Sequence, residues 1–289
     1  MPSPLATKKL VRGLLENDTH PMGLIRSDEF IDTYANRDDR IFFRHEFNTL
    51  PALSTQFFAY SAKSSGRIVN NEWMISGANI DGFNSSRGAY FDTSGDGLIW
   101  LAASSKSSNR LTLRPRPNGA VNKAYSKWAS MLWGTDEEVH FDTTIKTSGA
   151  AGDATATSGE MVLAGLVLTH AFNNHSGATP TITDADQIQF VRDNRKDTVN
   201  LYVLTSIAGV DAFYDTGVNL ANSTRYRLQI HMQADRTAKC YVNRVLVATT
   251  AALTTAINLI PHIAMRANGN LAAHGKVGVY YVEMSKNAS

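Results

Sequence analysis

From about residue 41 onward, polar and hydrophobic residues alternate with a period of two along much of the chain. The stretch 138–147 shows the pattern most clearly. One of its faces carries Val139, Phe141, Thr143 and Ile145, and the other carries Glu138, His140, Asp142, Thr144 and Lys146. The stretch 225–232 repeats the pattern with Tyr226, Leu228, Ile230 and Met232 on its apolar face. Strict alternation predicts β-strands with one buried face and one solvated face.

Other segments predict strands of different kinds. Residues 161–169 are apolar almost throughout, which predicts a central strand covered on both sides. Residues 187–205 read as two strands around the polar turn 193–197, and residues 276–284 read as a final strand. Turn-rich loops separate these strands, and no long helical pattern lies among them. We therefore predict an all-β fold, an antiparallel jelly-roll sandwich.

The first 40 residues follow a different pattern. A short helical stripe there consists of Leu10, Val11, Leu14 and Leu15. An isolated helix this short is marginal in water, so the stripe needs a partner surface. We predict two parts: a docking arm with a short helix over residues 1–40, and a sandwich over residues 41–289.

Composition narrows the function classes. The formal net charge is +2 over 289 residues, and there is no basic tract that would favour a nucleic-acid partner. No segment approaches the ~20 apolar residues of a membrane span. The single cysteine, Cys240, alternates in phase with apolar neighbours, which predicts a small buried side chain that forms no intramolecular disulfide.

Candidates for catalysis and metal binding are few. Glu138 and Asp142 have the spacing of a carboxylate pair on one strand face, but a solvated face explains these charges equally. The loop "DTSGDG" offers Asp92 and Asp96 as calcium ligands, yet the usual distal glutamate is missing and a plain turn needs no metal. We expect no catalytic residues, no metal and no cofactor, so the protein is not predicted to be an enzyme.

Three residues are candidates for ligand contact. Trp128 and Trp133 bracket "ASML" just before the clearest strand, and their rings could stack on a sugar or pack in the core. Arg244 lies at the tip of a hairpin predicted over residues 238–250, next to Asn243. A two-residue loop there requires positive φ at both tip residues, which arginine resists. We therefore expect a wider loop, or an arginine that is strained or engaged in a contact.

Residues from Trp128 to the end resemble the concanavalin A-like (laminin G-like) jelly roll. The likeness is carried by "WGTDEEVHFDTTIKTSG", "VLAGLVLT", "DADQIQFVRD", "IPHIAMRANG" and the long stretch from "DTGVNL" to "VATTAAL". In that family the penultimate hairpin has an aromatic-x-Leu-x-Ile strand, an Asp turn, and a strand that ends in Val-Asn-Gly. Tyr226, Leu228, Ile230, Asp235 and Val242-Asn243 match this pattern, whereas Arg244 replaces the glycine. "TDADQ" and "LVATTAAL" are most similar to domains of tailed-bacteriophage virion structural proteins.

This resemblance implies a non-enzymatic virion structural protein, most simply a capsid decoration or cement protein. Its partners would be other virion subunits, including the major capsid protein, and it would form a homo-oligomer. It would be synthesised in the host cytoplasm and reside in the virion. The alternative is a carbohydrate-binding module of a tail fibre or spike that contacts a surface glycan. A glycan hydrolase or lyase is a third reading.

Overall fold

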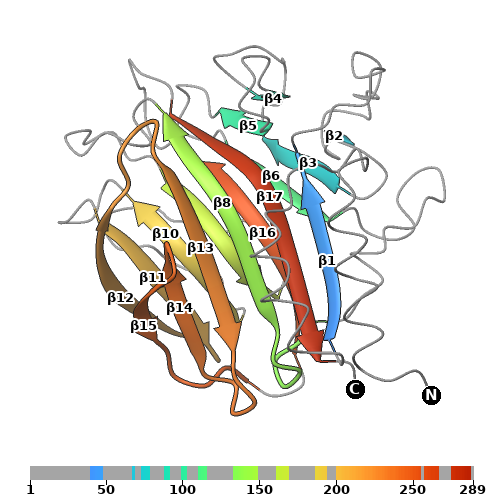
Figure 1. Ribbon diagram of the computed structural model, residues 1–289, viewed down its shortest axis with the longest axis vertical. Coiled ribbons are helices and arrows are strands. Elements are labelled where there is room, and N and C mark those ends of the chain that lie inside the picture. Colours follow the sequence, from blue (N-terminus) through green and yellow to red (C-terminus); the bar gives the residue numbers. More distant parts are fainter. Residues whose placement is uncertain are drawn as a thin grey trace, which may run out of the picture. The chain divides into compact units, whose positions relative to one another are not determined.

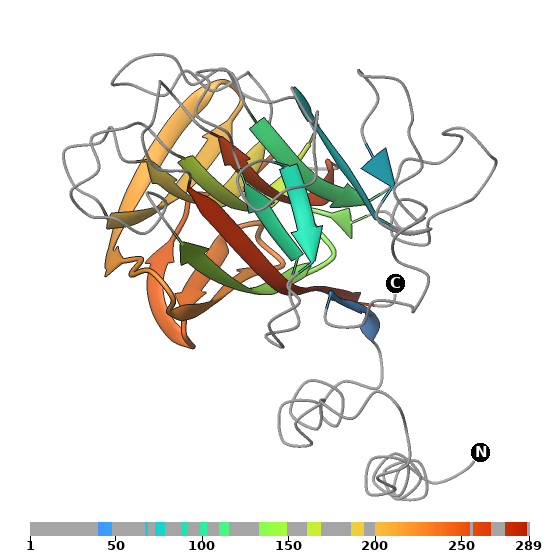
Figure 2. The ribbon, with the colours of Figure 1, turned by 90° about the horizontal axis from the view of Figure 1, so that it is seen from above.

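The computed structural model describes residues 40–47, 67–68, 73–78, 88–91, 99–102, 110–115, 133–148, 161–168, 186–193, 200–254, 257–266 and 275–287. The sandwich belongs to a compact unit that spans Phe42–Lys286, and Met1–Ile41 with Asn287–Ser289 form a separate unit. The predicted helix and its docking stripe of Leu10, Val11, Leu14 and Leu15 lie outside the described residues. All regular elements among the described residues are strands, packed as two layers (Figures 1 and 2).

The front sheet, named for its place in Figure 1, has eight strands. Seven of them run in the order β15 (Val245–Thr249), β14 (Ala238–Val242), β13 (Arg225–Met232), β8 (His140–Ser148), β17 (Lys276–Asn287), β5 (Ile99–Ala102) and β4 (Gly88–Phe91). The eighth, β1 (Arg40–Glu46), also pairs with β17. Strand β17 is long enough to pair with β5 through residues 276–279 and with β8 along most of its length.

The back sheet has nine strands and lies behind the first in Figure 1. Eight of them run in the order β12 (Val210–Asn219), β11 (Asn200–Ile207), β10 (Gln187–Asp193), β9 (Met161–Val167), β16 (Asn258–Arg266), β6 (Arg110–Pro115), β3 (Trp73–Ala78) and β2 (Arg67–Ile68). The ninth, β7 (Trp133–Gly134), pairs with the start of β16. Every strand pairing with a defined register is antiparallel.

The chain passes repeatedly from one sheet to the other, which produces the jelly-roll order. From β8 in the front sheet it enters β9–β12 of the back sheet, returns through β13–β15, and then places β16 and β17 in opposite sheets. Apolar side chains from both inner faces form one core. Its members include Trp73, Leu113, Phe141, Ile145, Phe190, Val203, Leu228, Ile230, Ile263 and Val282. The predicted all-β antiparallel sandwich is confirmed.

The alternation predicted from the sequence is confirmed in both clear strands. Val139, Phe141, Thr143 and Ile145 are buried toward the core, as are Tyr226, Leu228, Ile230 and Met232. Strand β9 is buried along its whole length, as its apolar composition predicts. One boundary differs, because Glu138 has a positive φ of 47° and β8 begins only at His140. The predicted strand was therefore too long, and Glu138 does not share a strand face with Asp142.

The strand pattern predicts the hairpin between β14 and β15, and the structure closes it in a two-residue loop. Val242 pairs with Val245, and the loop residues Asn243 and Arg244 have φ angles of 50° and 70°. The side-chain oxygen of Asn243 accepts a hydrogen bond of 2.9 Å from the backbone N–H of Arg227. Of the alternatives left open by the sequence, the wider loop is wrong, and Arg244 adopts the left-handed conformation itself.

Candidate functional site

The outer face of the back sheet carries polar side chains at its centre. Ile188 and Phe190 of β10 point into the core, so Gln187 and Gln189 point to the opposite face. Both glutamines are almost completely buried, at 1% exposure. Since buried amides require hydrogen-bond partners, their neighbours define the chemistry of this face.

Strand pairing extends this polarity across the sheet. Gln189 pairs with Gly165 of β9, and Gly165 pairs on its other side with His262 of β16. The register between β16 and β6 pairs Ile263 with Leu113, so His262 lies beside Arg114. We call Gln187, Gln189, His262 and Arg114 the polar row. It crosses β10, β9, β16 and β6, a span of roughly 14 Å at the usual strand spacing.

Gly165 is required where the polar row crosses β9. A Cβ atom at this position would lie 2.4 Å from the carbonyl oxygen of Ile188 and 2.6 Å from the Cα of Gln189. Both are backbone atoms of β10, which cannot move aside without disturbing the sheet. The glycine therefore lets β10 and β9 approach closely and leaves a position without a side chain between Gln189 and His262.

Hydrogen bonds connect three members of the polar row. Gln189 donates through Nε2 to Oε1 of Gln187, and His262 Nδ1 lies 3.2 Å from Oε1 of Gln189. Burial, with a smaller contribution from the charge of Arg114, lowers the pKa of His262 to about 3. His262 is therefore neutral at physiological pH. Because its Nδ1 faces an acceptor oxygen, that nitrogen carries the proton.

Several polar atoms on this face have no hydrogen-bond partner. They are Nε of Arg114, Oγ1 of Thr112 and Oγ of Ser206. Thr112 lies on β6 two residues before Arg114, on the same face, and pairs with Ala264. Ser206 of β11 pairs with Gln187. Buried polar atoms without partners are rare, since each costs about 1–3 kcal/mol. These three atoms share one sheet face, and others without a hydrogen-bond partner lie elsewhere, among them the indole nitrogen of Trp133.

The positive charge of Arg114 has no carboxylate partner among the described residues. Burial lowers its pKa, and no carboxylate of the described residues forms an ion pair with it. Its side chain is only partly buried, in contrast to the other members of the polar row. A partly buried guanidinium without a carboxylate favours an anionic partner, which it can bind through two parallel hydrogen bonds.

Apolar and aromatic side chains flank the polar row. Met161, Leu163, Val191, Leu204 and Ala264 form a small buried cluster against which Phe213 packs. Tyr202 meets Phe213 edge to face, with ring centroids 6.5 Å apart, and both rings are partly exposed. The outer face of the back sheet thus combines planar polar groups with accessible aromatic rings.

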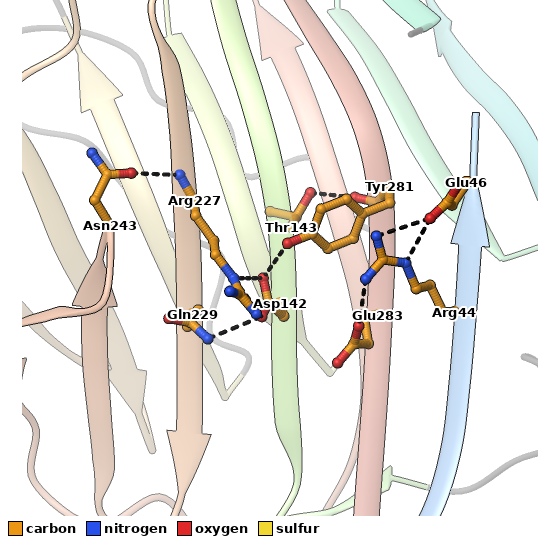
Figure 3. Close-up of polar contacts among 9 residues, drawn as sticks. All are labelled: Arg44, Glu46, Asp142, Thr143, Arg227, Gln229, Asn243, Tyr281 and Glu283. Atoms are coloured by element: carbon orange, nitrogen blue, oxygen red, sulfur yellow. Dashed lines mark hydrogen bonds and ion pairs between the residues drawn. The ribbon is translucent and has the colours of Figure 1, made fainter. Parts of the chain in front are cut away.

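The outer face of the front sheet holds a second polar cluster, centred on Asp142 of β8 (Figure 3). Arg227 of β13 donates to both carboxylate oxygens, from Nε at 2.9 and 3.1 Å and from Nη2 at 2.5 Å. Gln229 Nε2 and the Tyr281 hydroxyl donate as well, at 2.9 and 2.8 Å. Five hydrogen bonds use the full acceptor capacity of Asp142, so this carboxylate is structural and not free to act as a nucleophile or base.

The cluster continues through β17 to β1. Arg44 of β1 bonds Glu46 through Nε at 3.0 Å and Glu283 of β17 through Nη1 at 3.2 Å (Figure 3). Its guanidinium carbon lies 4.1 Å from the centre of the Tyr281 ring, a cation–π contact. Burial and the charge of Asp142 raise the pKa of Glu283 to about 7. Burial also raises the pKa of Tyr281, which keeps its hydroxyl a donor.

The structure places the candidate residues from the sequence in different environments, in the core, at a hairpin tip or outside the described residues. Trp133 is 1% exposed and packs edge to face on Phe43, so it belongs to the core and offers no ring for stacking on a sugar. Arg244 lies at the hairpin tip. Cys240 is fully buried, and burial raises its pKa, as expected for an inert thiol. Trp128, Asp92 and Asp96 lie outside the described residues.

Metal binding finds no support in the described part of the chain, where no group of three or more His, Cys, Asp or Glu side chains could hold an ion. Asp186, next to the predicted strand 187–193, has a structural role. Its carboxylate accepts hydrogen bonds of 3.1 Å from the backbone N–H groups of Ala208 and Thr254. The described residues include no helix long and apolar enough to cross a membrane.

Sequence reasoning missed the polar row and the partner of Asp142. Gln187 and Gln189 lay inside a correctly predicted strand, and two amides two residues apart are a detectable signal for one polar face. Nothing in the sequence connected them to His262 and Arg114, or Asp142 to Glu283. Asp142 and Glu283 are direct partners in the pairing of β8 with β17.

Comparison with known proteins shows the fold and no more. No family model matches the chain, and no curated protein matches it. A protein of unknown function from Shewanella oneidensis MR-1 is 12% identical, with a TM-score of 0.51 over 94% of this chain and 98% of that one. A Bacillus licheniformis β-glucanase has 13% identity and a TM-score of 0.47, covering 84% of this chain and 97% of its own.

The carbohydrate recognition domain of Emp47p has 11% identity and a TM-score of 0.49, over 77% of this chain and 90% of that domain. At such identities a likeness concerns fold alone, and of these three structures the Shewanella protein has a TM-score above 0.5. The chain is therefore similar to known jelly-roll sandwiches, and its function rests on its own residues.

Proposed function

We propose that this protein is a non-catalytic glycan-binding module whose ligand carries acidic groups. The observation that carries the proposal is the polar row on the outer face of the back sheet. It ends at Arg114, a guanidinium with an unsatisfied Nε and, within the described part of the chain, no ion-pair partner. Sugars are bound in proteins by planar polar side chains together with aromatic rings, and Tyr202 and Phe213 supply such rings on the same face.

The acidic character of the ligand follows from Arg114. A carboxylate or sulfate on a sugar would satisfy Nε and neutralise the guanidinium, whereas a neutral hydroxyl would do only the first. The neutral His262 and the two glutamines are buried and bonded to one another, so they form the polar floor beside Arg114. A uronate-containing glycan offers both kinds of group.

The absence of catalysis in this proposal has a specific basis. A glycosidase needs two carboxylates about 5–10 Å apart on one face. The alternating outward positions of β10 hold the amides Gln187 and Gln189 and a single carboxylate, Asp193, at the end of the strand. Asp142, the candidate from the sequence, lies on the other sheet and is saturated with hydrogen bonds.

The proposal can be tested by calorimetric titration of the full chain with polygalacturonate, alginate and a neutral glucan. We expect binding to an acidic polymer and no release of reducing ends or unsaturated products. Arg114→Gln should weaken binding about tenfold or more, since it removes a charge-assisted contact. The matched control is Arg225→Gln, an exposed arginine of the front sheet that should change affinity less than about twofold.

The possible outcomes separate the two parts of the proposal. Equal affinity for neutral and acidic polymers, unchanged by Arg114→Gln, would remove the acidic ligand but leave a glycan-binding module. Binding to none of these polymers would overturn both.

A structural subunit of a phage virion is the second candidate function, and one observation favours an assembly role. Strand β15 forms an edge of the front sheet without charged residues, and its Val245 and Leu246 are 65% and 50% exposed. Such edges are surfaces for strand pairing or association. If assembly uses this edge, Leu246→Lys should reduce self-association in sedimentation velocity runs at several protein concentrations; an unchanged profile would speak against it.

A further inference from the structure

Strand β1 is held to the sandwich on one side by β17. The backbone N–H of Phe47 donates to the carbonyl oxygen of Tyr280 at 2.8 Å, just beyond the end of β1. Phe43 and Phe47 pack on the core. Arg44 adds a charged link, because it lies over the ring of Tyr281 and pairs with Glu283 (Figure 3). The attachment of β1 therefore depends in part on the charge of one carboxylate.

That carboxylate lies in a cluster with more acids than bases. Asp142, Glu283 and Glu46 face Arg44 and Arg227, so three carboxylates share two guanidiniums. Asp142 and Glu283 are opposite one another on β8 and β17 and are 5% and 8% exposed. Like charges at directly opposed positions repel, and burial strengthens the repulsion.

The groups around Glu283 differ in their freedom to accept the excess proton. Asp142 already accepts five hydrogen bonds, and Glu46 is the most exposed of the three acids, at 26% for its side chain. Tyr281 donates to Asp142 from the same strand as Glu283. Among the described residues, His140 lies two residues from Asp142 on the same face of β8 and stacks on His231 of β13. Glu283 is thus the member of the cluster that takes up the proton.

We propose that Glu283 acts as a proton-operated link to β1: when ionised it holds Arg44 and fixes the strand, and when protonated it releases Arg44. The pKa of Glu283 is raised to about 7, first by burial and then by Asp142, so the switch operates near neutral pH. This inference is independent of glycan binding, which concerns the opposite sheet.

The proton has opposite effects on β1 and on the whole sandwich. The raised pKa of Glu283 means that the folded state binds the proton more tightly than the unfolded state, where the ordinary value is 4.5. Its contribution to global stability is complete below pH 4.5 and is lost as pH rises through about 7. The ion pair with Arg44 changes in the other direction and strengthens over the same interval. An acid that contributed only to global stability would not make global stability and the attachment of β1 change in opposite directions with pH.

Hydrogen exchange of the full chain, corrected for intrinsic rates, tests the link at pH 6 and pH 8. We expect protection of the segment 42–47 to increase about two- to fivefold at the higher pH, the range of a partly exposed ion pair. In Glu283→Gln this pH dependence should disappear. The matched control is Glu46→Gln, which removes the other partner of Arg44 and should preserve the pH dependence.

A second measurement covers the case in which the glutamine variant folds poorly. Carbon-13 NMR titration of the wild-type carboxyl groups should show Glu283 with a midpoint near 7. A midpoint near 4.5, or protection of 42–47 that changes with pH equally in wild type and Glu283→Gln, would overturn the proposal.

Discussion

The outer faces of the two sheets differ in how fully their buried polar groups are hydrogen-bonded. On the front sheet, charged groups are buried and almost every acceptor is satisfied, as the five hydrogen bonds to Asp142 show. On the back sheet, the groups are mostly neutral, yet Arg114, Thr112 and Ser206 have unsatisfied atoms. A satisfied network holds strands in place, whereas buried polar groups without partners lower the stability of the fold.

Removal of one partner from the front-sheet network should have the largest effect on stability. Arg227→Met leaves Asp142 buried without its cation, and side-chain exposure is low for both residues, at 18% and 7%. We expect the free energy of unfolding to fall by about 3–5 kcal/mol in urea denaturation at pH 7. The double variant Arg227→Met with Asp142→Asn should recover part of this loss.

The control for this prediction is Arg225→Met, on the same strand and face. Arg225 is exposed and stacks over the ring of Tyr280 at 4.5 Å, so its loss should cost no more than about 1 kcal/mol. Equal effects of the two substitutions would show that the buried network is no stronger than a surface contact.

On the back sheet, the close approach of β10 and β9 should be the most sensitive point. Gly165→Ala forces a Cβ against backbone atoms and should destabilise the fold by about 1–3 kcal/mol in thermal or urea unfolding. Gly217→Ala has nothing within 4 Å of the new Cβ but has a φ of +67°, so it measures strain from a positive φ alone. A smaller effect at Gly165 than at Gly217 would show that the strands can separate at little cost.

Two threonines compare a satisfied hydroxyl with an unsatisfied one. Thr143 Oγ1 donates to the carbonyl oxygen of Tyr281 at 2.6 Å, and Thr143→Val should cost about 1 kcal/mol. Thr112 is equally buried but its Oγ1 has no partner, so Thr112→Val should leave stability unchanged or raise it slightly. Should both substitutions destabilise the protein alike, the hydroxyl of Thr112 has a partner in solution, and the contrast between the faces is weaker than the structure indicates.

The smallest effect is expected at the edge of the front sheet. Arg244 has a φ of 70° in the loop between β14 and β15, a conformation that glycine adopts without strain. Arg244→Gly should stabilise the fold by up to ~1 kcal/mol, measured as a higher melting temperature. A melting temperature lower by several degrees would show that contacts of the arginine side chain outweigh its backbone strain.

Local patterns in the sequence determined the strands of this protein. Alternation identified the buried faces of β8 and β13, continuous apolar residues identified β9, and Asn243-Arg244 marked the tip of a hairpin. These features depend on the two-residue period of an extended chain, which a single segment displays by itself. The end of a strand was harder to predict, as Glu138 shows. The alternation of polar and apolar residues continues past the point where the backbone leaves the strand.

Tertiary structure alone decided which strands became neighbours, and thereby both polar clusters. Tyr281 and Asp142 are separated by 139 residues in the sequence but form a hydrogen bond because β17 pairs with β8. Gln189 and His262 lie 73 residues apart and meet across the glycine of β9. Register and strand order arise from the joint packing of two sheets around one core, and no single segment contains that information.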